Sequence, residues 1–79
     1  MVSIIIELEK LGFNLTEDGA YISKHYKTGE VVLIQFVHHY LECYIDTKLV
    51  FSLLYVELKT ETFLMLLAEY GIIEKTIKR

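Results

Sequence analysis

The sequence predicts an α+β domain with an N-terminal helix, an antiparallel meander of three or four strands, and a C-terminal helix. Apolar residues near both ends recur at helical spacing, the middle is rich in β-branched and aromatic residues, and turn signals divide that middle. We expect both helices to pack on one face of the sheet. The chain has 79 residues and no proline, which predicts one domain over residues 1–74 and a short basic tail over residues 75–79.

The first predicted helix covers residues 3–11. Its apolar positions lie on one face and are Ile4, Ile5, Leu8 and Leu11. Gly12 can adopt the left-handed backbone that ends a helix, and Phe13 can then fold back onto the last turn. The same stop recurs near the other end of the chain at Gly71 and Ile72.

The second predicted helix ends directly before Gly71. Thr60 is the expected N-cap, and Glu61 suits the positive end of the helix dipole. The buried stripe consists of Phe63, Leu64, Leu67 and Tyr70.

The region between the helices is predicted to form strands joined by hairpin turns. Turn signals occur at residues 17–19 and 28–29, and residues 46–48 form a further tight turn. Val31–Val37 is a predicted central strand. Tyr40–Asp46 alternates between an apolar face and a face of tyrosines and acids.

Residues 49–58 are apolar on both faces of the predicted strand, which is unusual for a sheet with one solvated face. Two interpretations fit this pattern. The second face meets another subunit or partner, which we favour, or the segment is partly helical.

The composition predicts a protein that binds other proteins. Hydrophobic residues make up 53% of the chain, and a small domain has too little interior to bury so many of them. The surplus predicts an exposed apolar patch, and therefore a homodimer or a complex with another protein. The candidate interaction residues combine tyrosines, acids and the apolar strand: Tyr40, Glu42, Tyr44, Asp46, Leu49, Phe51, Leu53 and Tyr55.

The residues that could carry chemistry do not form a recognisable motif. His38 and His39 are adjacent and would face opposite sides of a strand, although a turn could bring their neighbours closer. Cys43 lies in an alternating apolar pattern typical of a buried thiol. We therefore expect no enzyme activity, catalytic residue, cofactor or metal. A small ligand-binding or enzymatic domain that uses His25, His38, His39 or Cys43 is retained as an alternative.

The charge distribution suggests a second alternative. Residues 1–74 carry five lysines and eleven acids, a formal charge of −6, so direct nucleic-acid binding is not expected. In size and charge the chain resembles small proteins of phages and mobile elements, which implies an acidic inhibitor that blocks a basic, nucleic-acid-binding surface. A single cysteine and the absence of a long apolar run predict a cytoplasmic protein without membrane segments.

Overall fold

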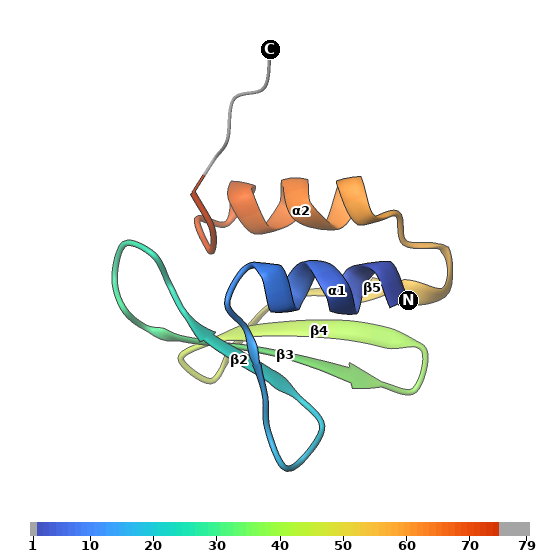
Figure 1. Cartoon of the computed structure of the whole chain (residues 1–79), viewed down its shortest axis with the longest axis horizontal. Coiled ribbons are helices and arrows are strands. Elements are labelled where there is room, and N and C mark those ends of the chain that lie inside the picture. The colour runs from blue at the N-terminus through green and yellow to red at the C-terminus, as the bar shows by residue number, and fades with distance from the viewer. Residues whose placement is uncertain (1, 75–79) are drawn as a thin grey trace.

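The computed structural model describes residues 2–74, which form a five-stranded antiparallel sheet between two helices in chain order (Figure 1). The elements are α1 (Val2–Lys10), β1 (Asn14–Leu15), β2 (Tyr21–Lys24), β3 (Val31–Val37), β4 (Tyr40–Ile45), β5 (Lys48–Leu54), the 3-10 helix η1 (Tyr55–Glu57) and α2 (Thr60–Glu69). No helix in this part of the chain is long and apolar enough to cross a membrane.

The predicted order of helix, antiparallel meander and helix is confirmed, but the number of strands is higher than predicted. The sheet has five strands in the order β1-β2-β3-β4-β5, where the sequence predicts three or four. The shortest strand, β1, has only two residues, so it shows no alternation that sequence patterns could reveal. The predicted basic tail, residues 75–79, lies outside the described residues.

The two helices end as the sequence predicts. Gly12 has a φ of 96°, and the backbone N–H of Phe13 donates to the carbonyl of Leu8 at 2.9 Å. Gly71 has a φ of 75°, and the N–H of Ile72 donates to the carbonyl of Leu67 at 2.8 Å. Both are Schellman ends, in which a left-handed glycine folds the next apolar residue back onto the helix.

The start of α2 differs from the prediction by one residue. Lys59, not Thr60, is the N-cap, and its side chain makes no capping hydrogen bond. Thr60 is instead the first helical residue. Its hydroxyl is therefore one position too late to cap the helix.

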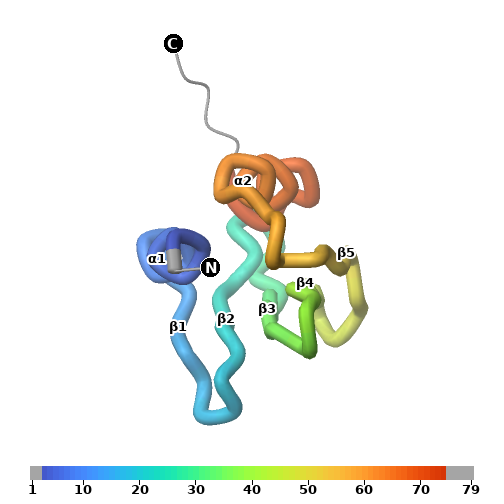
Figure 2. Tube along the Cα trace, turned by 90° about the vertical axis from the view of Figure 1, so that its right-hand side faces the viewer, coloured from blue at the N-terminus to red at the C-terminus, as the bar shows by residue number. Residues whose placement is uncertain are grey.

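The hydrophobic core lies between the helices and one face of the sheet. Its most deeply buried side chains come from α1, β3, β4 and α2, and they are Ile4, Leu8, Val32, Ile34, Leu41, Cys43, Phe63 and Leu67. Figures 1 and 2 show α1 and α2 as neighbours on this side of the sheet, and the two helices contact each other. We call this side the inner face and the opposite side the outer face.

The segment 49–58 is partly helical, which is one of the two interpretations of its sequence. The strand β5 ends at Leu54, and Tyr55–Glu57 then form one turn of 3-10 helix. The ring of Tyr55 packs edge-to-face on Phe36, with the ring centroids 5.5 Å apart, and its hydroxyl donates to the His38 carbonyl at 3.3 Å. These two contacts hold the end of β5 against β3 and the β3–β4 turn.

Two hairpins use two-residue turns that contain non-glycine residues with a left-handed backbone. His38, in the β3–β4 turn, has a φ of 58°. In the β4–β5 turn, Asp46 and Thr47 have φ values of 54° and 71°, the signs of a type I′ turn. Thr47 is the costlier residue, because a β-branched side chain is strongly disfavoured in this conformation.

Replacing Thr47 with glycine should therefore stabilise the fold. We expect Thr47→Gly to raise the free energy of unfolding by about 1 kcal/mol, since glycine adopts positive φ without steric cost. Urea denaturation of the two proteins measures the change. Thr47→Ala, which keeps a β-carbon, should gain less, and a destabilising Thr47→Gly would contradict the interpretation.

Candidate interaction surface

The outer face is covered by no element of the described chain, although it is largely apolar. Antiparallel pairing aligns its residues in rows across the strands: Ile22, Leu33, Tyr44 and Leu49; Gln35, Glu42 and Ser52; and Val37, Tyr40 and Leu54. Val31 pairs with the exposed Lys24 at the end of the face, next to the β4–β5 turn. When one face of a sheet is solvated, its strands normally place polar residues on that face. The apolar composition of the outer face therefore indicates a surface suited to contact with another molecule.

Several apolar side chains on this face are strongly exposed. The relative exposure is 53% for Leu49, 47% for Tyr40, 45% for Leu54 and 44% for Val31. By contrast, their neighbours in β4, Leu41 and Cys43, point to the inner face and are completely buried. The two faces of β4 thus separate into a packed core side and an accessible side.

The structure divides the eight predicted interaction residues between the two faces. Tyr40, Glu42, Tyr44 and Leu49 lie on the outer face, and Asp46 lies in the turn at its end. Phe51 is a buried core residue, and Leu53 and Tyr55 pack against the core. These three do not share a surface with the tyrosines of β4.

A β-bulge explains this division. Cys43 pairs with Phe51, whereas the next residue, Tyr44, pairs with Leu49, so Val50 is an additional residue in β5. One extra residue reverses the side on which the following side chains lie. Simple alternation places Leu49 and Phe51 on one face, and the bulge moves them to opposite faces.

Strand β3 supplies outer-face residues that the sequence-based set omits. Val31, Leu33 and Val37 belong to the uncovered side, while Val32 and Ile34 are buried in the core. The signal was present in the sequence, because apolar residues at successive positions of a strand require both faces to meet apolar surroundings.

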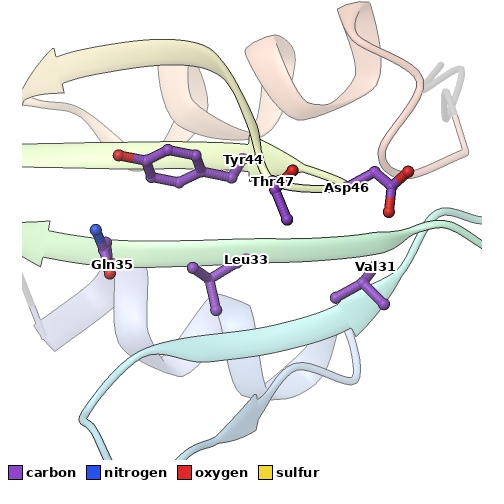
Figure 3. Close-up of a pocket in the computed structure, with 6 residues that line it drawn as sticks. All are labelled: Val31, Leu33, Gln35, Tyr44, Asp46 and Thr47. Atoms are coloured by element: carbon purple, nitrogen blue, oxygen red, sulfur yellow. The ribbon is translucent and has the colours of Figure 1, made fainter.

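A shallow hollow of about 530 Å³ lies at one end of the outer face (Figure 3). Its lining comes from β3, β4 and the β4–β5 turn: Val31, Leu33, Gln35, Tyr44, Asp46 and Thr47. Figure 3 shows these side chains on the near side of the sheet, with the helices behind it. The wall is mainly apolar, and a few polar groups lie at its edge, which is the usual composition of a binding site.

A hydrogen-bonded group of three polar side chains borders the hollow. The Tyr44 hydroxyl donates to Oε1 of Glu42 at 2.8 Å, and Nε2 of Gln35 donates to the same oxygen at 3.4 Å. The hydrogen bond to the Glu42 carboxylate raises the pKa of Tyr44, because it favours the protonated phenol. The carboxylate is thereby held against the sheet by its neighbours.

The histidines and the cysteine do not converge. His38 and His39 form the exposed β3–β4 turn, and Cys43 is in the core. His25 lies in the β2–β3 hairpin, where its Nδ1 accepts hydrogen bonds from the backbone N–H groups of Lys27 and Thr28. Within residues 2–74, no three His, Cys, Asp or Glu side chains are grouped closely enough to hold a metal ion.

Comparisons with known proteins give no relatives. No protein-family model matches the chain, and neither the curated proteins nor the solved structures contain a match.

Burial should make the Cys43 thiol unreactive in the folded protein. Removal from water raises the pKa of Cys43 to about 12, so the reactive thiolate is scarce at neutral pH. We expect no modification by a thiol-specific disulfide reagent in native buffer and complete modification in guanidinium chloride. Rapid labelling of the native protein would contradict the core position of Cys43.

Proposed function

We propose that the protein is a non-enzymatic interaction module that forms a homodimer through the outer face of its sheet. The observation that carries this proposal is the apolar composition of a sheet face that no described element covers. Burial of Leu33, Tyr40, Leu49 and Leu54 supplies the driving force, at roughly 25 cal/mol for each Å² of apolar surface removed from water.

The size of the face limits the strength of the dimer. Strands β3, β4 and β5 have six or seven residues and are about 20 Å long, the four-residue β2 is about 13 Å long, and neighbouring strands lie about 4.8 Å apart. One face therefore projects an area of about 350 Å², and side chains that stand out from the sheet enlarge the accessible area. This places the interface at the small end of specific complexes, where association is transient. We expect a dissociation constant in the micromolar range.

A charged residue in the apolar row of Val37, Tyr40 and Leu54 should prevent association. Leu54→Glu places a carboxylate on the outer face, whereas Met65→Glu places one on the solvent side of α2, where Met65 is 64% exposed. In sedimentation equilibrium over a range of concentrations, the wild type and Met65→Glu should dimerise and Leu54→Glu should remain monomeric. Equal dimerisation of the two variants would contradict an outer-face interface.

The central carboxylate distinguishes self-association from binding to a basic protein. Glu42 lies between the two apolar rows of the outer face, so a face-to-face dimer removes both of its copies from water. Glu42→Gln, whose amide oxygen can still accept the Tyr44 hydrogen bond, should strengthen the dimer about tenfold. The matched control Glu9→Gln, in the exposed part of α1, should have no effect.

The acidic-inhibitor alternative predicts the reverse effect of the same substitution. A basic partner would be attracted by Glu42 and Asp46, so Glu42→Gln would weaken that complex and reduce its salt dependence. A dimer weakened by Glu42→Gln would therefore contradict the homodimer proposed here.

The cytoplasmic location stays a prediction from the sequence.

A further inference from the structure

We infer that Tyr40 of each copy inserts into the hollow of the other copy, which gives two identical contacts around one two-fold axis. This inference depends on the proposed homodimer and specifies which groups meet within it. In a symmetric dimer of this kind, a surface must contain both the projecting group and the cavity that receives it. The outer face contains both.

The projecting residue and the hollow lie at opposite ends of the outer face. Tyr40 is paired with Val37 and Leu54, directly beside the β3–β4 turn. The hollow lies next to the β4–β5 turn and includes Tyr44. Four residues of strand separate Tyr40 from Tyr44, a distance of about 13 Å.

A single symmetry axis can satisfy both contacts. A two-fold axis can lie in the interface, perpendicular to the strands, and pass near Glu42 in β4. Rotation about this axis reverses the direction of the strands, so each end of one face meets the opposite end of the other. Tyr40 then lies over the partner's hollow, and the partner's Tyr40 lies over the hollow of the first copy. The contact closes after two copies, so it does not propagate into a filament.

The chemistry of Tyr40 fits the hollow. Tyr40 is half exposed, and its hydroxyl makes no hydrogen bond to the other described residues. The apolar wall formed by Val31 and Leu33 suits the ring, while the Gln35 amide oxygen and the Asp46 carboxylate at the edge can accept a hydrogen bond from the phenol hydroxyl. Because tyrosine is neutral, it adds no charge next to the acids of the outer face.

The first test removes the projecting group. Tyr40→Ala should raise the dissociation constant of the dimer on the order of 100-fold, because two aromatic contacts are lost and buried aromatic residues dominate such interfaces. Tyr26→Ala is the matched control, since Tyr26 is 45% exposed but lies in the β2–β3 hairpin, away from the outer face. It should leave the dimer unchanged. Circular dichroism confirms that each variant is folded.

The second test pairs a chain that lacks the projecting group with a chain whose hollow is filled. Leu33→Trp places an indole in the hollow, and its homodimer should be weakened like that of Tyr40→Ala. In a mixture, Tyr40 of the Leu33→Trp chain can enter the empty hollow of the Tyr40→Ala chain. At the second contact, the indole faces the space left by the missing Tyr40. The two variants should therefore prefer each other to themselves.

The mixture has a direct readout. The natural chain has no tryptophan, so the indole of Leu33→Trp is the only one present. Its emission should shift to shorter wavelength when Tyr40→Ala is added, and native mass spectrometry should show more than the statistical fraction of heterodimer. Addition of Tyr26→Ala, which retains Tyr40, serves as the reference for non-complementary mixing.

The outcomes separate this inference from the proposed function. If the wild type dimerises but Tyr40→Ala and Tyr26→Ala behave alike, or the two complementary variants show no preference, the insertion of Tyr40 is wrong and the dimer remains. If the wild type is monomeric at every concentration, the homodimer itself is wrong, and the insertion fails with it.

Discussion

The rest of the structure depends on an imbalance between a sheet with two apolar faces and helices that can cover only one of them. The helices α1 and α2 have nine and ten residues, and together they close the inner face. Val32, Leu41 and Cys43 are completely buried there, next to Phe63 and Leu67. The described residues form no further element on the other side of the sheet. Its apolar outer face is therefore available to a second molecule.

The polar row in the middle of the outer face limits how strongly that face can associate. Glu42 accepts hydrogen bonds from Tyr44 and Gln35, so its carboxylate already has partners within its own chain. These bonds reduce the cost of removing the carboxylate from water, but they do not remove it. The face therefore combines apolar rows that favour contact with a charge that opposes indiscriminate association. In the proposed dimer, this balance favours a reversible association.

Helices and turns were predictable from the sequence because their signals are local. Gly12 and Gly71 mark the helix ends, and residues 46–48 mark a turn, without reference to distant parts of the chain. The outer face was only partly predictable, because it depends on strand register. The bulge at Val50 reverses the side of Phe51, and no local feature of the sequence specifies it. The hollow also depends on pairing, since β3 and β4 contribute its opposite walls.

The same bulge bears on which part of the sheet is used for association. Strand β5 is an edge strand, with β4 as its only neighbour in the described part of the chain, and an exposed edge can pair with another chain. The bulge at Val50 interrupts the regular spacing of its backbone groups and increases the local twist, while Lys48 begins the strand with a charge. The helix η1 then ends the strand directly after Leu54. Few consecutive residues remain flat enough for edge pairing, whereas the bulge turns Leu49 toward the outer face. The distortion that protects the edge thus enlarges the apolar face, and this favours association face to face.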